Sequence, residues 1–182
     1  RRPPSSTLDR SSAASDVYKR QLRALRLHPP EMKLVIQRVR RAEVRGEESV
    51  VGSIGAGALV LVGVAEGDTQ EDAEYLSRKT ALLRIFSDGN GRMNESIEAV
   101  DGSYLVVSQF TLYGDCRKGN RPSYIEAAKP EAGRAGYDAY VQTLKKFGRP
   151  VETGTYQAEM VVSLENDGPV TLILESRGRR PT

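Results

Sequence analysis

Histidine and cysteine are nearly absent from this sequence, and their scarcity removes several common kinds of active site. The only histidine, His28, lies in the first 31 residues, ahead of the part that shows regular strand and helix patterns. The folded part therefore has no Ser-His-Asp or Cys-His site and no histidine-based zinc site. The only cysteine, Cys116, excludes an intramolecular disulfide and favours a reducing, cytoplasmic location. We interpret Cys116 as a small packing residue in preference to a reactive thiol, since no histidine is present to activate it.

Long apolar runs and glycine-rich phosphate-binding motifs are also missing. No apolar stretch approaches the roughly 20 residues that a membrane helix needs, so no contact with a membrane is expected. The sequence contains no G-x-x-x-x-G-K-[ST] motif, and its glycine-rich run at 52–57 leads into a strand pattern, not from a strand into a helix. P-loop and dinucleotide-binding sites are therefore excluded, and we expect no cofactor.

Positive charge is distributed unevenly along the 182 residues. Seven of the 27 Lys and Arg and three of the 24 Asp and Glu fall in residues 1–31, which leaves 20 basic and 21 acidic residues in the remainder. Because that remainder is nearly neutral, any affinity for RNA must come from local patches such as Arg117, Lys118 and Arg121.

Composition divides the chain into three segments. Residues 1–31 carry four prolines and no strand or helix periodicity, and we interpret them as a disordered leader. Because Met32 opens a clean strand pattern, our hypothesis is that the native protein begins there. Residues 32–176 have the size of one domain, and residues 177–182 form a polar tail.

The strand patterns make this domain an α/β unit that is rich in β-structure. Strands are expected at 33–39, 49–54 and 58–64 and within 103–112, and the stretch 59–64 is apolar on both faces, as in a buried central strand. At the end of the chain, residues 158–164 and 170–174 predict a hairpin around Asn166-Asp167-Gly168-Pro169, because Asp-Gly is a strong turn signal.

Two main helices are predicted between the strands. Asp68 and Glu71 resemble an acidic capping box that begins the first helix, which we expect to end near Arg84. Pro130 begins the second helix, which extends to about Lys146. Its apolar stripe, which is more typical of a core than of a cofactor site, comprises Tyr137, Tyr140, Val141, Leu144 and Phe147.

Two polar clusters interrupt otherwise apolar strand patterns. The first is Ser108-Gln109-Phe110-Thr111, which is either a strand leaving the core or a site where Ser108, Thr111 and the backbone N–H groups between them bind a carbonyl or its oxyanion. The second spans 166–171, where the expected hairpin turn is complicated by Pro169, which must lie at a strand's first residue or edge.

The order and separation of the two clusters resemble the signature motifs of the D-aminoacyl-tRNA deacylase family. The matching strings are SQFTL at 108–112 and NDGPVT at 166–171, supported by MKLVIQRV at 32–39 and KGNRPS at 118–123. The resemblance covers about residues 32–175. It implies a deacylase fold of mostly antiparallel β-sheets or a barrel packed with helices, a homodimer, and hydrolysis of the ester bond of D-aminoacyl-tRNA and of glycyl-tRNA. Such an activity would be a chiral proofreading step in translation.

The resemblance also assigns roles to residues of the first cluster. Ser108, Gln109 and Phe110 would build the pocket for the aminoacylated adenosine, while backbone groups and the 2′-hydroxyl of the tRNA drive the reaction. Thr111 has been considered a nucleophile in this family, but no base is present to activate its hydroxyl, so we assign it a positioning role.

In the second cluster, Gly168-Pro169 is expected to be cis and to reach into the partner subunit's active site. There it would hold the α-amino group so that an L side chain meets backbone. Asn166, Val170 and Thr171 would fix this gate. Two further residues keep two interpretations each: Arg38 orients the signature strands or is a solvated strand end, and Met160 lines the adenine pocket or packs in the core.

Two other functional classes stay open. A non-catalytic module that binds an RNA end or a nucleotide would use the same pocket without turnover. A metal-dependent hydrolase would need carboxylates such as Asp115, Glu126 and Asp167, which form no close motif, so we expect no metal site.

Overall fold

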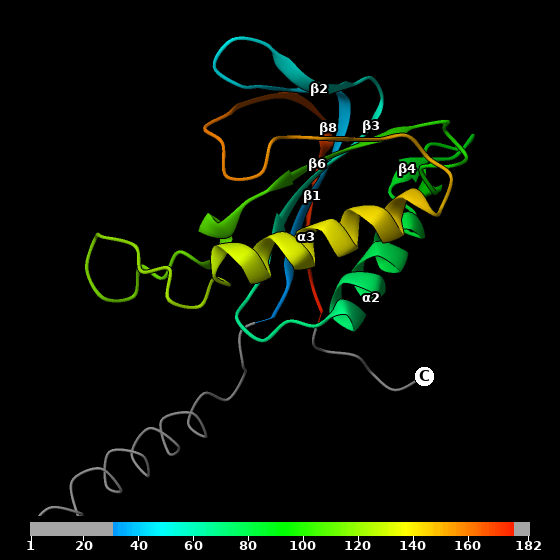
Figure 1. Ribbon diagram of the computed structural model, residues 1–182. Helices are drawn as coiled ribbons and strands as arrows, with labels where there is room; N and C mark the ends of the chain where they lie inside the picture. The colour runs from blue at the N-terminus through cyan, green and yellow to red at the C-terminus, as the bar shows by residue number, and fades with distance from the viewer. Residues whose placement is uncertain (1–30, 177–182) are drawn as a thin grey trace, which may run out of the picture.

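The computed structural model describes residues 31–176, which fold into a curled six-stranded sheet, a separate two-stranded sheet and two helices (Figure 1). The predicted leader, apart from Glu31, and the polar tail lie outside the described residues. The strands are β1 (Lys33–Arg45), β2 (Val50–Ile54), β3 (Gly57–Gly63), β4 (Phe86–Ser87), β5 (Met93–Glu95), β6 (Ser103–Ser108), β7 (Val151–Thr153) and β8 (Val161–Glu175). The helices are α2 (Gln70–Ala81), α3 (Pro130–Lys145) and the short 3-10 turn η1 (Phe110–Tyr113).

Strand β1 is the centre of the six-stranded sheet. One of its edges pairs with β8 along almost its whole length, and its other edge pairs first with β3 and then with β2, all antiparallel. Beyond β3 the order continues to β6 and β7, and these two pairings are parallel. As predicted, β3 is a buried central strand, because it lies between β1 and β6 and six of its seven residues are buried.

The sheet curls until β2 lies against β7 and β6. A Cβ atom on Gly52 of β2 would stand 2.8 Å from the carbonyl oxygen of Thr153 in β7, so the close approach of these strands requires glycine. Inside the curl a small core forms, which consists of Val39, Ala42, Val44, Ile54, Leu59, Leu105 and Val107. This curl is the structural counterpart of the expected barrel, and the predicted β-rich fold class is confirmed.

Both helices cover the opposite face of the sheet, where the main core lies (Figure 1). Four of the five stripe residues of α3 are buried as predicted, whereas Phe147 lies just beyond the helix end and is 38% exposed. Burial raises the pKa of Tyr140, whose hydroxyl donates to Thr80 Oγ1 of α2 at 2.9 Å. The helices are therefore joined by packing and by buried hydrogen bonds.

The predicted capping box of α2 was wrong by one residue. The reciprocal pair is Thr69 and Asp72: the Asp72 carboxylate accepts from the Thr69 backbone N–H at 2.9 Å and from the Thr69 hydroxyl at 2.8 Å. Asp68 is engaged elsewhere, because its carboxylate accepts from the N–H groups of Met32 at 3.0 Å and of Ala65 at 2.6 Å. It thus fixes the start of β1 instead of the start of the helix.

The predicted C-terminal hairpin was also wrong. Strand β8 runs through residues 166–170 without reversing and stays antiparallel to β1, where Gln37 faces Thr171 and Val39 faces Asn166. The Asp-Gly-Pro segment is a bulge of extra residues between these two pairs. The turn-forming residues produce a local bulge and no reversal, because the long strand β1 pairs with β8 on both sides of it.

Within residues 31–176, neither helix has the length and apolarity that crossing a bilayer requires.

Candidate active site

A cleft of about 630 Å³ lies where β6 ends, and the first signature cluster forms part of its wall. Val107, Ser108, Gln109 and Phe110 line one side. The other walls come from the segments before and after α3, and their residues are Tyr124, Ala127, Ala128, Pro130, Tyr156, Gln157, Ala158, Glu159, Met160 and Val162. This volume suits a nucleoside-sized group, because small-molecule sites span roughly 300–1,000 Å³.

The backbone turns sharply at the cleft, which argues against a strand that leaves the core at the first cluster. The Gln109 N–H still donates to Val62 of β3 at 2.8 Å, but η1 begins at Phe110, so the strand ends as a 3-10 turn and does not continue into solvent. The first N–H groups of a helical turn have no partner within it. Those of Phe110 and Thr111 therefore have no partner within the turn, as the interpretation of this cluster as a carbonyl-binding or oxyanion-binding site requires.

Thr111 itself is exposed, and its hydroxyl accepts a short hydrogen bond from the side-chain amide of Gln109. A donor of this kind withdraws electron density from the hydroxyl oxygen, which is the opposite of what activates a nucleophile. The contact fixes the geometry of the turn instead.

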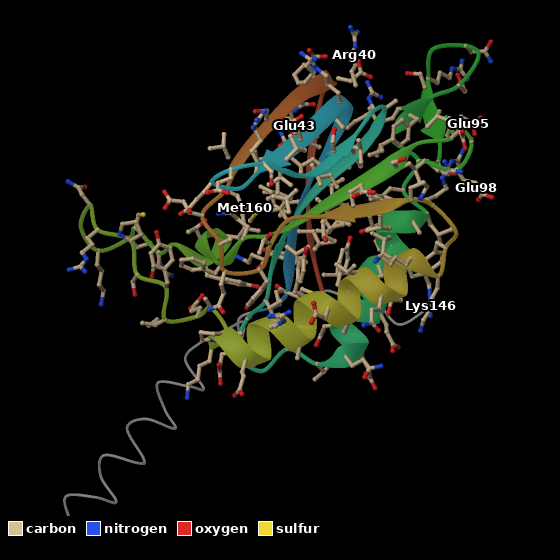
Figure 2. All side chains as sticks on the ribbon, turned by 45° about the horizontal axis from the view of Figure 1, so that its top comes forward. Arg40, Glu43, Glu95, Glu98, Lys146 and Met160 are labelled. Carbon is tan, nitrogen blue, oxygen red and sulfur yellow. The ribbon has the colours of Figure 1, made fainter. Side chains whose placement is uncertain are left out.

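An aromatic pair borders the mouth of the cleft. Phe110 and Tyr124 meet edge to face with ring centroids 5.2 Å apart, and both stay partly exposed, at 58% and 38%. Met160, labelled in Figure 2, also lines the cleft. Its sulfur accepts the Thr155 N–H at 3.2 Å, and its side chain packs against the inner core. Met160 therefore both lines the cleft and packs against the core, and its contact with an adenine stays a prediction.

The second signature cluster is held by its own polar side chains. The Asn166 side chain accepts from the Val170 N–H at 2.9 Å and donates to the Thr171 hydroxyl at 2.9 Å. Between these anchors the Gly168-Pro169 peptide bond is cis, as expected, and both residues are exposed. The bulge therefore presents the Gly-Pro unit outward from the sheet edge.

Arg38 fastens this bulge to the body of the protein. Its guanidinium donates to the Asp167 carbonyl oxygen at 3.1 Å and to the Ile85 carbonyl oxygen, beyond α2, at 2.6 Å. It also pairs with the Asp167 carboxylate at 3.1 Å. Arg38 is only 9% exposed and lies in the middle of β1, so it is not a solvated strand end.

Within one subunit the two clusters lie far apart. Ser108 pairs with Val62 on β3, whereas the bulge lies within β8, so β3 and β1 separate the two. Three interstrand spacings amount to roughly 14 Å. The residues that line the cleft include no member of the 166–171 bulge.

An apolar row joins the cleft to the β8 edge on the sheet face opposite the helices. Val107, Leu61, Val35 and Ile173 are consecutive cross-strand neighbours. Their exposure rises toward the edge, from 2% at Val107 to 68% at Ile173. An apolar strip of this kind indicates a contact surface.

A second hollow, of about 390 Å³, lies between β1, β2 and β8. It is lined by Arg41, Ala42, Glu43, Ser53, Ser163, Leu164 and Glu165, and Arg41 and Glu165 pair with each other at 2.7 Å. Because it contains no residue of either signature, we assign the site to the cleft at the end of β6.

Comparison with known proteins agrees with this arrangement. Residues 35–175 match the model of the family described as D-Tyr-tRNA(Tyr) deacylase. The chain belongs to this deacylase family. A D-aminoacyl-tRNA deacylase from Heliobacterium modesticaldum is 56% identical over 147 residues, which are 81% of this chain and 98% of the relative. A second one, from Thermotoga petrophila, is 54% identical over 145 residues, or 80% of this chain and 97% of the relative.

Solved structures place the chain in the same deacylase fold. The c-Myc DNA Unwinding Element Binding Protein is 38% identical and superimposes with a TM-score of 0.74, over 79% of this chain and 97% of that one. A probable eukaryotic D-amino acid tRNA deacylase superimposes with a TM-score of 0.68 at 18% identity, over 79% and 98% of the two chains, which supports the fold alone.

Several walls of the deacylase cleft were not predicted from the sequence. Tyr124, Tyr156 and Gln157 lie nine or more residues from either signature. Gln157 has a positive φ of 61°, unusual for a residue other than glycine, but such strain leaves no local signal in the sequence. Across residues 31–176, no group of three or more His, Cys, Asp or Glu is placed to hold a metal ion.

Proposed function

We propose that the protein hydrolyses the ester that joins a D-amino acid, or glycine, to the 3′-terminal adenosine of tRNA. The observation that carries this proposal is the position of the signature turn: membership of the deacylase family is combined with a nucleoside-sized cleft whose wall is Ser108-Gln109-Phe110. The cytoplasm, where tRNA is used, is the proposed location.

The proposed chemistry needs no protonatable side chain at the reacting ester. Water attacks the ester carbonyl carbon, and the 2′-hydroxyl of the adenosine accepts a proton from that water while it passes its own proton to the 3′-oxygen. The bond between the carbonyl carbon and the 3′-oxygen then breaks, which leaves the free amino acid and a tRNA with a 3′-hydroxyl. The N–H groups of Phe110 and Thr111, at the start of η1, are the donors for the oxyanion. Fixed backbone dipoles can stabilise this charge without reorganising during the reaction.

Stereochemical selection is proposed to require a homodimer. Gly168 and Pro169 are exposed, yet within one subunit they lie roughly three strand spacings from the cleft. A second copy docked along the apolar row Val107–Leu61–Val35–Ile173 would bury that strip and bring its own bulge to this cleft. Rigid backbone at that position would reject an L side chain sterically and still admit glycine, which has no side chain.

Hydrolysis of matched D-Tyr-tRNA and L-Tyr-tRNA by the full chain, with EDTA present, tests the proposal. We expect release of D-tyrosine alone, with the chelator making no difference. Tight tRNA binding without turnover of either ester would favour a non-catalytic RNA-end module. Loss of the activity in EDTA, with recovery on adding a divalent ion, would favour the metal-dependent hydrolase. Sedimentation of the same preparation reports whether the active species is a dimer.

Thr111→Ala is expected to retain most of the deacylase activity. The substitution removes one hydroxyl hydrogen bond from the Gln109 amide, so kcat/KM should fall by no more than about fivefold. Thr111→Ser is the matched variant, because it keeps a hydroxyl. Activity that survives in Thr111→Ser but vanishes in Thr111→Ala, with tRNA binding intact, would make Thr111 the nucleophile.

A further inference from the structure

A projecting loop beside the cleft carries a concentration of positive charge. The chain between η1 and α3 extends away from the domain (Figure 1), and its base is closed by Asp115 and Ser123, whose backbones exchange hydrogen bonds of 2.9 and 3.0 Å. Between them lie Arg117, Lys118 and Arg121, which we call the basic tip. No acidic residue occurs from 116 to 125. The tip is therefore a local positive patch on a nearly neutral domain.

The cations of the tip differ in how they are held. Arg117 is fixed, because its guanidinium donates to the Asp115 carboxylate at 2.8 and 2.7 Å and its N–H donates to the same carboxylate at 3.0 Å. These contacts hold the pKa of Asp115 well below its usual range. Lys118 and Arg121 are exposed and form no salt bridge with any residue from 31 to 176. Their charges are available to a ligand.

The tip is continuous with the mouth of the cleft. Tyr124 directly follows Ser123 at the base of the loop, three residues after Arg121, and it both lines the cleft and contacts Phe110 edge to face. Ile125 beside it is 76% exposed. Cys116, which we had interpreted as a packing residue, is exposed at the start of the tip, so that interpretation is wrong. The base of the loop therefore adjoins the mouth of the cleft.

We propose that Lys118 and Arg121 bind backbone phosphates of the tRNA strand that leads into the cleft. This inference rests on the proposed function: when the terminal adenosine occupies the cleft, the phosphodiester chain before it must leave through the mouth. Charge complementarity identifies that chain as the occupant of the tip. Such contacts carry no base information, so they position the acceptor end without selecting a tRNA sequence.

A pair of substrates separates phosphate binding from chemistry. D-Tyr-tRNA contains the phosphodiester chain, and 3′-O-D-tyrosyl-adenosine contains the same ester but no phosphate. Lys118→Ala/Arg121→Ala should lower kcat/KM for D-Tyr-tRNA by about 10- to 30-fold at ~0.1 M salt. Because two phosphate contacts are lost, the slope of log kcat/KM against log salt concentration should become less steep by roughly 1.4 to 1.8. Hydrolysis of the adenosine ester should be unchanged.

The matched control is Lys145→Ala/Lys146→Ala. These exposed cations lie at the opposite end of α3 from the loop, where Lys146 is labelled (Figure 2). The control and the charge-keeping variant Lys118→Arg/Arg121→Lys should both match the wild type on D-Tyr-tRNA.

Three outcomes would overturn the inference. The first is an unchanged kcat/KM of Lys118→Ala/Arg121→Ala on D-Tyr-tRNA, and the second is an equal loss of kcat/KM on both substrates. The third is a change in the sedimentation coefficient of this variant, which would show that the tip contacts another protein subunit. If the wild type hydrolysed neither ester, the proposed function would fail by itself. Binding of uncharged tRNA by the same variants, measured by fluorescence anisotropy against salt, would still test the tip.

Discussion

Replacing Gly168 with alanine is expected to lower kcat/KM toward a D-aminoacyl-tRNA by about 100-fold, because displacing an active-site group by ~1 Å can cost that much. Gly168 has φ +122°, and an added Cβ would lie 2.8 Å from Val170 Cγ2 and 3.0 Å from the Arg38 guanidinium. The same Cβ would lie 3.1 Å from the backbone nitrogen of Val170, which donates a hydrogen bond to the Asn166 side chain. The bulge must therefore shift, and with it the proposed gate.

The preference for D-Tyr-tRNA over L-Tyr-tRNA is a second measurement, because a general loss of stability would not change it. Because the shifted gate no longer holds the α-amino group or blocks an L side chain, the ratio of D-Tyr-tRNA to L-Tyr-tRNA hydrolysis should also fall, by a factor on the order of 10. Both esters are to be measured well below the unfolding temperature. An unchanged ratio would show that residues 166–171 do not set stereochemistry.

Gly148→Ala supplies the matched control. Gly148 also has a positive φ, of +79°, but nothing lies within 4 Å of the position of its Cβ, and it follows the far end of α3. Both alanine variants should lose about 1–2 kcal/mol of unfolding free energy through backbone strain. Only Gly168→Ala should change the deacylation rate, which would separate the gate from strain in general.

The sequence predicted those parts of the fold that depend on local periodicity. The alternation in β1, the doubly apolar β3 and the 3.6-residue stripe of α3 each follow from which face a side chain must bury. Both ends of β3 and α3 were located to within one residue, whereas β1 was predicted to end at Val39 and continues to Arg45. The capping residue of α2 was missed because Asp68 and Thr69 are both good caps. Which of the two caps the helix depends on a hydrogen bond between the Asp68 carboxylate and the N–H of Met32, a residue far away in the sequence.

The bulge in β8 shows a different limit. Asn166-Asp167-Gly168-Pro169 has the composition of a reversing turn, and locally nothing distinguishes it from one. What prevents reversal is the 13-residue strand β1, which pairs with β8 on both sides of the segment. Likewise Tyr124 and Tyr156 reach the cleft only because α3 packs on the sheet. Such residues are brought together by tertiary structure and not by spacing.

Arg38→Met is expected to destabilise the protein and the gate together. The change removes donors from the Asp167 and Ile85 carbonyl oxygens and from the Asp167 carboxylate, which should cost about 2–4 kcal/mol of unfolding free energy. Deacylation of D-Tyr-tRNA should fall by a factor on the order of 10 to 100, since the bulge loses its link to the segment after α2. Chemical denaturation and kcat/KM at a temperature where the variant is folded measure the two effects.

Arg40→Met is the matched control, because it removes a second arginine that pairs with Asp167. Arg40 pairs with the same Asp167 carboxylate at 3.1 Å, but its side chain is 76% exposed, whereas that of Arg38 is 11% exposed. An exposed ion pair contributes at most about 1 kcal/mol, so Arg40→Met should leave both stability and discrimination nearly unchanged. Equal losses in the two variants would mean that the charge of Asp167, and not the buried link from β1 to Ile85, holds the bulge in place. Arg38→Lys distinguishes these further, because it keeps the charge but lacks the planar fork that reaches two carbonyl oxygens at once.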